Sequence, residues 1–177
     1  MAARADDFTD CFSIGNKNYT NPSIYAQCEQ ACTRLIAVRT GKSLATAYTA
    51  RGSWRHLQKN DDGALKDYDR ALSIDPTNVE IYDYRADSLL AEGDIDSAIA
   101  SYDKAISVDP TYAAARYSQG KAYQTKGDVE HARANYKAAL ALPKARASFG
   151  QKQDRIQEWA QSNAADALKA LDAAPGK

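Results

Sequence analysis

Apolar and polar positions in the middle of the chain follow the period of an α-helix. Tyr82, Ala86 and Leu89 stand four and three apart, and Ala98 begins a second series with the same spacing. Such spacing places apolar side chains on one helix face. Gly93 and the aspartate after it separate the two series, because glycine can end a helix and aspartate can cap the next one. The pattern therefore predicts two helices joined by a short turn.

The predicted helix pair recurs every 34 residues. Four positions repeat: Ala64, Tyr68, Ala71 and Pro76 return as Ala98, Tyr102, Ala105 and Pro110, and a third copy has Ala132, Tyr136 and Ala139. The alanines allow close helix contacts and the tyrosines fill the volume around them. The prolines end the second helix because they lack an amide donor and disfavour helical geometry in the preceding residue. A fixed period predicts one unit stacked on itself.

On these residues, the chain from Leu44 to about Leu142 resembles the tetratricopeptide repeat (TPR) family. The resemblance implies an all-α fold, a right-handed solenoid of antiparallel helix pairs with a C-terminal capping helix. We expect one domain overall. Its parts are an N-terminal segment over 1–42 with a degenerate half repeat, three repeats over 43–144 (about 45–78, 79–112 and 113–146), and a capping helix over 147–173.

Two copies depart from the family's pattern. In copy one, Trp54 stands where a small residue is usual, Arg55 replaces an aromatic residue, and Lys59-Asn60 replaces the Gly-Asp turn. In copy three, Arg116 occupies the first aromatic slot. We expect Trp54 to be too large for a close helix contact, so that it either disturbs the packing against the N-terminal segment or acts there as a specific wedge.

The flanking segments differ in pattern. Residues 147–173 predict one amphipathic helix, whose apolar positions are Phe149, Ile156, Trp159, Ala160, Ala164, Ala167, Leu168 and Leu171. A solenoid needs an outer element that is apolar inside and polar outside, so this helix is expected to be the cap. At the other end, Asp6 to Asn21 shows little helical periodicity and is expected to be irregular, with Cys11 on it. Ile24 to Val38 predicts a helix.

Composition excludes several classes of function. Lys and Arg total 23 and Asp and Glu total 23, so no global field favours nucleic acid or an anionic membrane. No apolar stretch is long enough to insert into a membrane. Neither histidine has a Cys or Ser partner at a catalytic spacing, so we expect no enzyme and no cofactor. The clustered cysteines lack a fourth ligand, so we expect no metal site.

All three cysteines lie near the N-terminus, which indicates a local staple. Cys28 and Cys32 are four residues apart on one helix face, where a bridge between them would be strained. A bond from Cys11 to either of them would close about 20 residues and contribute roughly 3 kcal/mol. Spacing alone leaves both partners open.

A second resemblance concerns the run C-T-R-L-I from Cys32 to Ile36. It is similar to small secreted TPR proteins of alphaproteobacteria, whose N-terminal half repeat carries a paired cysteine. This resemblance implies a Cys11–Cys32 disulfide, with Cys28 as the alternative partner. Ala3-Arg4-Ala5 also resembles the end of a signal peptide. We therefore expect a periplasmic or secreted protein; the alternative is a cytoplasmic protein with three reduced thiols.

In this repeat class, the first helix of each pair lines a concave groove. The period assigns to it Thr49, Ser53 and His56 in copy one, Glu80, Asp83 and Asp87 in copy two, and Tyr117, Lys121 and Gln124 in copy three, with Tyr84 beside the carboxylates. The three carboxylates share one helix face, which predicts an acidic, aromatic-edged strip for a peptide with basic or amide donors. The alternative is a solvated helix face. The carboxylate clamp of chaperone-binding TPR proteins is absent, because its slots hold residues such as Thr49, Ser53 and Tyr84.

Two arginines, Arg51 and Arg85, precede Gly52 and Ala86 at equivalent slots. Anion binding is one interpretation, but we expect them to pack along the helix pair and reach an acidic side chain such as Asp69 or Asp103.

The predicted function is a non-catalytic scaffold that binds a protein or peptide client in the concave groove. The alternative is a structural module that assembles with copies of itself through the repeat surfaces.

Overall fold

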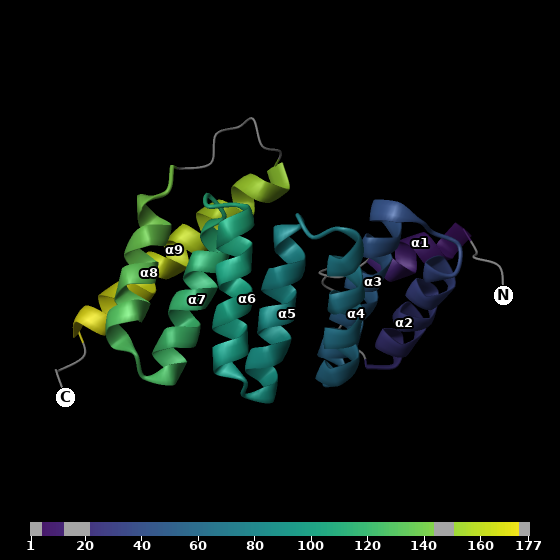
Figure 1. Ribbon diagram of the computed structural model, residues 1–177, viewed down its shortest axis with the longest axis horizontal. Coiled ribbons are helices and arrows are strands. Elements are labelled where there is room, and N and C mark those ends of the chain that lie inside the picture. The colour runs from purple at the N-terminus through teal and green to yellow at the C-terminus, as the bar shows by residue number, and fades with distance from the viewer. Residues whose placement is uncertain (1–4, 13–21, 144–150, 174–177) are drawn as a thin grey trace. The chain divides into compact units, whose positions relative to one another are not determined.

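The computed structural model describes residues 5–12, 22–143 and 151–173, and the regular structure within them is helical. In chain order the helices are α1 (Ala5–Phe12), α2 (Pro22–Ile36), α3 (Gly41–Leu57), α4 (Asp61–Ile74), α5 (Val79–Glu92), α6 (Ile95–Val108), α7 (Ala113–Lys126), α8 (Val129–Ala141) and α9 (Gln151–Ala173) (Figure 1). The predicted all-α fold is confirmed. None of the helices described is long and apolar enough to cross a bilayer.

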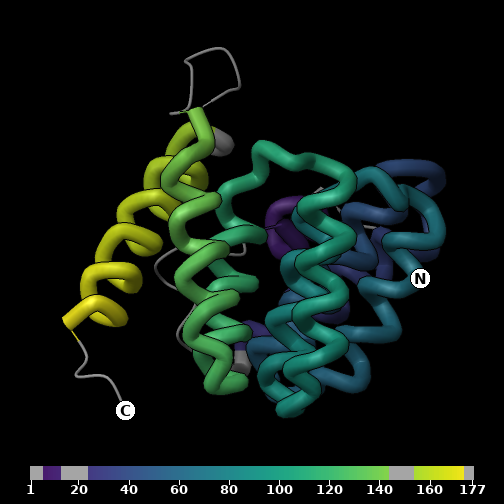
Figure 2. The backbone as a smooth tube through the Cα atoms, turned by 60° about the vertical axis from the view of Figure 1, so that its left-hand side comes forward, coloured from purple at the N-terminus to yellow at the C-terminus, as the bar shows by residue number. Residues whose placement is uncertain are grey.

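The chain forms two compact units. Unit 1 (Met1–Glu92) contains α1 to α5, and unit 2 (Gly93–Lys177) contains α6 to α9. Within unit 1, α3 packs against α2 and α4, and α5 packs against α4 with a smaller contact to α3. Within unit 2, α7 packs against α6 and α8, and α9 packs against both α7 and α8. In Figure 2, α9 is the yellow helix. Helix pairs thus stack on one another inside each unit.

The turns inside the pairs have the predicted chemistry. Gly127 has a φ of 86° after α7, and Asp128 then accepts a hydrogen bond from the His131 amide (3.1 Å). In copy one, Lys59 takes the left-handed conformation at a φ of 63°, and Asn60 accepts from the Gly63 amide (3.1 Å). Copy one therefore keeps the turn geometry without its glycine. The amides of Lys59 and Asn60 donate to the carbonyl oxygens of His56 and Arg55 (both 2.9 Å), which closes the end of α3.

Close helix contacts in the repeats form around buried tyrosines. Tyr68, Tyr102 and Tyr136 are at most 1% exposed, and the alanines around them are buried as well. At Gly120, a Cβ atom would lie 2.6 Å from the ring of Tyr136, so only glycine permits this approach of α7 and α8. The small and aromatic positions of the period are core positions, as predicted.

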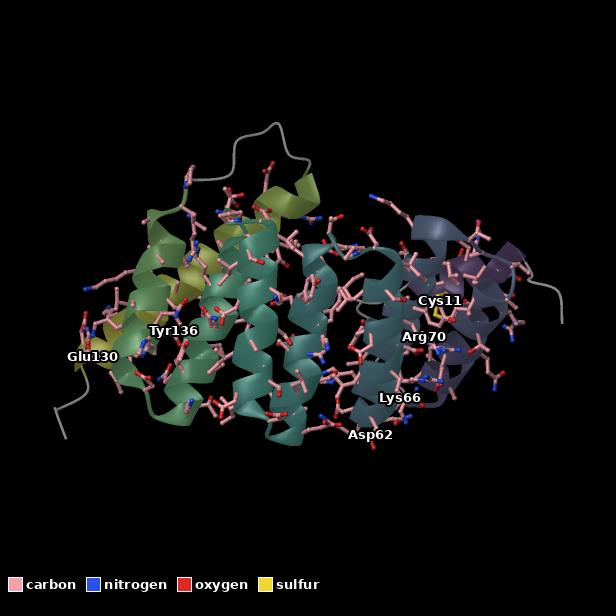
Figure 3. All side chains as sticks on the ribbon, in the orientation of Figure 1. Cys11, Asp62, Lys66, Arg70, Glu130 and Tyr136 are labelled. Atoms are coloured by element: carbon pink, nitrogen blue, oxygen red, sulfur yellow. A yellow bond between two sulfur atoms is a disulfide. The ribbon has the colours of Figure 1, made fainter. Side chains whose placement is uncertain are left out.

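The N-terminal segment corrects one expectation. Residues 5–12 form α1 rather than an irregular stretch, and two anchors explain why. The Asp7 carboxylate is buried and lies 2.6 Å from the Arg34 guanidinium, and Cys11 is joined to Cys32 by a disulfide, visible as the yellow bond in Figure 3. Tertiary contacts, rather than local propensity, therefore stabilise this short helix.

Trp54 connects α3 to α1 and α2. It is fully buried, its indole Nε1 donates to the Cys11 carbonyl oxygen (2.9 Å), and its ring centroid lies 5.7 Å from that of Tyr25 in α2. Cys11 belongs to the last turn of α1, where carbonyl groups lack partners within the helix. Of the two interpretations from the sequence, the specific wedge matches this packing.

At the other end, α9 packs through small residues. Ala160 and Ala164 are fully buried, whereas Trp159, expected on the same apolar face, is 52% exposed. The edge of its ring meets Tyr117 of α7 at a centroid distance of 5.3 Å. A bulky indole does not fit where alanines set the helix separation, so it lies at the margin of the contact. Phe149 lies outside the described residues.

Candidate functional site

The predicted groove residues of copies one and two lie together in unit 1. Thr49, Ser53 and His56 are on α3, and the carboxylates and Tyr84 are on the neighbouring α5. The Ser88 hydroxyl of α5 lies 3.1 Å from Nδ1 of His56, which joins the two helices directly. This partly buried hydrogen bond links the first helices of copies one and two.

Tyr84 lies on α5 close to the three predicted carboxylates. Its side chain is partly exposed, and its ring stacks on that of Tyr68 at a centroid distance of 6.3 Å. Burial raises the pKa of Tyr84 to about 12, and the negative charges of Glu80, Asp83 and Asp87 add to the shift. All three carboxylates therefore act on the same phenol. We call Glu80, Asp83, Tyr84 and Asp87 the acidic strip.

The hydroxyl groups of α3 have internal partners. The Thr49 hydroxyl donates to the Ala45 carbonyl oxygen (2.9 Å), and the Ser53 hydroxyl donates to the Thr49 carbonyl oxygen (3.1 Å). Ser53 Oγ also accepts from the Tyr68 hydroxyl (3.3 Å), and burial raises the pKa of that phenol strongly. These groups position Tyr68 beneath Tyr84, so their structural role is to support the strip.

His56 has a geometry that excludes a catalytic triad. Its Nδ1 atom contacts both Asp61 Oδ1 (2.5 Å) and Ser88 Oγ (3.1 Å). A triad requires the carboxylate and the hydroxyl on opposite ring nitrogens, so that one nitrogen can take the proton from the nucleophile. Ser88 is also fully buried and unavailable to a substrate. The cluster instead ties α3, the start of α4 and α5 together. Sequence reasoning missed this role of Ser88, although its small polar side chain in an apolar helix row is a signal of a buried hydrogen bond.

The predicted residues of copy three lie in unit 2. Tyr117 is 9% exposed, with its ring 6.0 Å from that of Tyr136. Gln124 Oε1 accepts from the Tyr136 hydroxyl (2.8 Å), and the Lys121 ammonium lies 5.8 Å from the centre of the Tyr117 ring. Lys121 and Gln124 are exposed, whereas Tyr117 belongs mostly to the core between α7, α8 and α9.

The cysteines form a compact group in unit 1. The disulfide joins Cys11 to Cys32, and Cys28 is a free, buried thiol. Burial, and secondly the charge of Asp10, raise the pKa of that thiol, which disfavours the reactive thiolate. No group of three His, Cys, Asp or Glu residues within the described ranges has an arrangement that could hold a metal ion.

Three family models match the repeats. A model described as TPR repeat covers residues 86–127, and models described as Tetratricopeptide repeat cover 67–100 and 113–146. The chain contains tetratricopeptide repeats. Comparison with curated proteins gives no match.

Solved structures have the same repeat fold. A crystal structure of MamA protein is 25% identical with a TM-score of 0.60, and the match covers 66% of this chain but only 63% of that one. The first TPR of Spaghetti, bound to the HSP90 peptide SRMEEVD, is 18% identical with a TM-score of 0.60, covering 75% of this chain and 96% of that one. SycD, a type III secretion translocator chaperone of Yersinia enterocolitica, is 14% identical with a TM-score of 0.62 and coverages of 73% and 91%. The two matches of lower identity show the TPR fold alone.

Proposed function

We propose that this protein is a non-catalytic scaffold that binds a peptide or protein segment on the groove face of its repeats, with the acidic strip as the contact surface in unit 1. The observation that carries the proposal is the partly exposed ring of Tyr84, surrounded by the charges of three carboxylates. An aromatic ring offers apolar contact area, and the carboxylates accept hydrogen bonds from a ligand.

The chemistry of the strip favours a segment rich in Lys, Arg, Asn or Gln. Two solved TPR domains of Spaghetti bind the HSP90 peptide SRMEEVD, which has three acidic residues near its end. The acidic strip would repel such a peptide, and Thr49, Ser53 and Tyr84 replace the cationic clamp. The proposed client is therefore opposite in charge to that peptide.

We further propose that the protein functions in the periplasm or outside the cell. The Cys11–Cys32 disulfide supports this location, because structural disulfides persist in oxidising compartments. Thiol labelling of denatured protein from its source organism tests the proposal. One reactive thiol, from Cys28, is expected; three reactive thiols would indicate the reducing cytoplasm.

The binding proposal is tested with fluorescence anisotropy on an array of short peptides that vary in Lys, Arg, Asn and Gln content. We expect basic and amide-rich peptides to bind the native chain. The Glu80→Gln, Asp87→Asn variant is expected to bind about tenfold more weakly, because two ion pairs to the peptide are lost. The matched control is Asp62→Asn, Glu130→Gln, which removes two carboxylates from the first turns of α4 and α8 (Figure 3). Equal losses in both variants would contradict a specific strip. Light scattering over a dilution series then shows whether the chain binds itself instead, since only self-assembly changes mass with concentration.

A further inference from the structure

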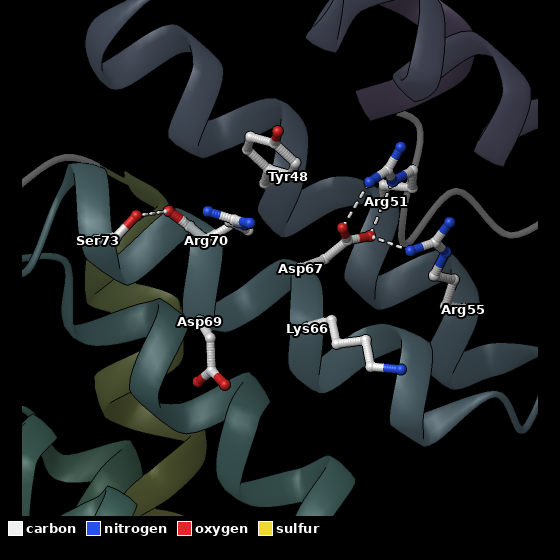
Figure 4. A pocket seen from close by; sticks show the side chains of 8 residues that line it. All are labelled: Tyr48, Arg51, Arg55, Lys66, Asp67, Asp69, Arg70 and Ser73. Atoms are coloured by element: carbon white, nitrogen blue, oxygen red, sulfur yellow. Dashed lines mark hydrogen bonds and ion pairs between the residues drawn. The ribbon is translucent and has the colours of Figure 1, made fainter.

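A separate cleft in unit 1 lies over α3 and α4. It has a volume of about 540 Å³, and its walls include Tyr48, Arg51, Arg55, Lys66 and Arg70 around the carboxylate of Asp67 (Figure 4). This volume is within the range of small-molecule sites in proteins. None of these residues belongs to the acidic strip, so the cleft requires its own explanation.

The floor of the cleft is rigid. Asp67 is 2% exposed, and its Oδ2 and Oδ1 atoms accept from Nε (2.8 Å) and Nη2 (2.6 Å) of Arg51. Arg55 donates through Nη1 to Asp67 Oδ2 (3.0 Å) and through Nε to Glu29 Oε1 of α2 (2.7 Å). Paired bonds of this kind fix the plane of each guanidinium group. One carboxylate thus orients two arginines side by side.

The charges of Arg51 and Arg55 on the floor of the cleft are compensated, but those of Lys66 and Arg70 at its edge are not. Arg51 and Arg55 are balanced by Asp67 and Glu29, and Asp69 is paired with Arg85 of α5 (2.9 Å), as expected for that arginine. Within the described part of the chain, Lys66 and Arg70 have no ion-pair partner. Both side chains are exposed and line the cleft on either side of Asp67 (Figure 4).

The position of these two cations on α4 is unfavourable without a ligand. They are four residues apart, so they share one face of the helix, where like charges repel. Asp62 precedes Lys66 by another four residues on the same row (Figure 3), but no ion pair joins them. An anion between the two cations would remove the repulsion and accept hydrogen bonds from both.

We propose that this cleft binds a doubly charged oxyanion, the phosphoryl or sulfate group of a ligand. The Lys66 ammonium and the Arg70 guanidinium hold the group directly, because the two uncompensated charges match those of a dianion. Arg51 and Arg55, fixed by Asp67, form a rigid, charge-balanced floor, and Tyr48 provides an aromatic wall for the remainder of the ligand. The cleft takes a charge opposite to that expected for a client of the acidic strip, and its binding does not rest on the proposed scaffold function.

The first test is a titration of the full chain with inorganic phosphate at constant ionic strength, followed by two-dimensional ¹⁵N NMR of the α4 amides and the arginine Nε–H groups. We expect saturable shifts confined to the cleft, and none when chloride replaces phosphate. Shifts that do not saturate, that spread over both units or that chloride reproduces would overturn the proposal.

The second test compares two variants with exposed substitutions. Lys66→Gln, Arg70→Gln is expected to weaken phosphate binding tenfold or more, since two charge-assisted hydrogen bonds are lost. Lys104→Gln is the matched control, because it removes an exposed cation from the equivalent position of α6, 34 residues after Arg70. Equal affinity in both variants would refute the assignment.

Two further ligands identify the source of the oxyanion. Free phosphoserine and a phosphoserine-containing peptide are titrated in the same way. Tighter binding of the peptide indicates a modified protein as the natural ligand, whereas equal binding indicates a small phosphorylated molecule. The failure of both to compete with inorganic phosphate would contradict a ligand site in this cleft.

Discussion

Replacement of Trp54 by phenylalanine tests how the N-terminal helix is held. The indole Nε1 of Trp54 donates to the Cys11 carbonyl oxygen at 2.9 Å, and both residues are fully buried. Phenylalanine keeps an aromatic ring but removes the donor. The carbonyl group, in the last turn of α1, then has no replacement donor from its own helix.

The expected cost follows from these contacts. An unsatisfied buried carbonyl costs about 1–3 kcal/mol. The smaller ring also leaves unfilled space next to Tyr25 and the disulfide, which adds about 1 kcal/mol. We therefore expect the free energy of unfolding of the Trp54→Phe variant to fall by about 2–4 kcal/mol.

The assay is urea unfolding followed by far-UV circular dichroism, with Trp159→Phe as the control. Trp159 is half-exposed and its ring contacts Tyr117 only by an edge, so its replacement is expected to cost less than about 1 kcal/mol. A Trp54→Phe variant as stable as the control would refute the account of Trp54 as the wedge that joins α3 to α1.

Three other predictions concern single contacts. The disulfide joins residues 21 positions apart, and its reduction is expected to lower the free energy of unfolding, followed in thermal melts, by about 3 kcal/mol. The thiol of Cys28 is expected to resist alkylation at pH 8 until the chain unfolds. Gly120→Ala places a Cβ atom 2.6 Å from the Tyr136 ring and is expected to cost about 1–3 kcal/mol in urea unfolding, with a stable variant contradicting the close contact. Tyr84 is expected to stay protonated at pH 11 in the folded chain, because its pKa is raised to about 12. Its contribution to stability is therefore present below pH 10 and is lost as the pH rises through 12. Ultraviolet absorbance titration of the native and Tyr84→Phe chains measures the ionisation of this phenol.

The repeat pattern in the sequence was sufficient to predict the helix pairs. The tyrosine and alanine positions, the prolines after α4 and α6, and the caps at Asp94 and Asp128 all act locally or between adjacent helices, so a 34-residue period reveals them. Lys59 shows the limit of residue preferences, because backbone hydrogen bonds from Lys59 and Asn60 to the end of α3 maintain the left-handed turn without glycine.

Long-range contacts account for what the sequence did not predict. Helix α1 depends on the burial of Asp7 and Cys11 against α2, which local periodicity over eight residues cannot reveal.

The candidate site could be predicted only as a row of residues. The period placed Glu80, Asp83 and Asp87 on one face of α5, but it could not show that Ser53 and Tyr68 support Tyr84 from below. Nor could it show that Asp67 orients two arginines in the neighbouring cleft, because that contact depends on the packing of α4 against α3.

Site-directed photo-crosslinking tests the central claim most directly. A photoreactive phenylalanine analogue is placed at Tyr84 in the full chain, and at Lys104 as a control, in extract from the source organism, and crosslinked segments are identified by mass spectrometry. The account predicts one defined partner at position 84, joined through a segment rich in basic or amide side chains, and lost with Glu80→Gln, Asp87→Asn. Equal crosslinking at both positions, or crosslinks at position 84 only to a second copy of the chain, would contradict the proposed client-binding surface.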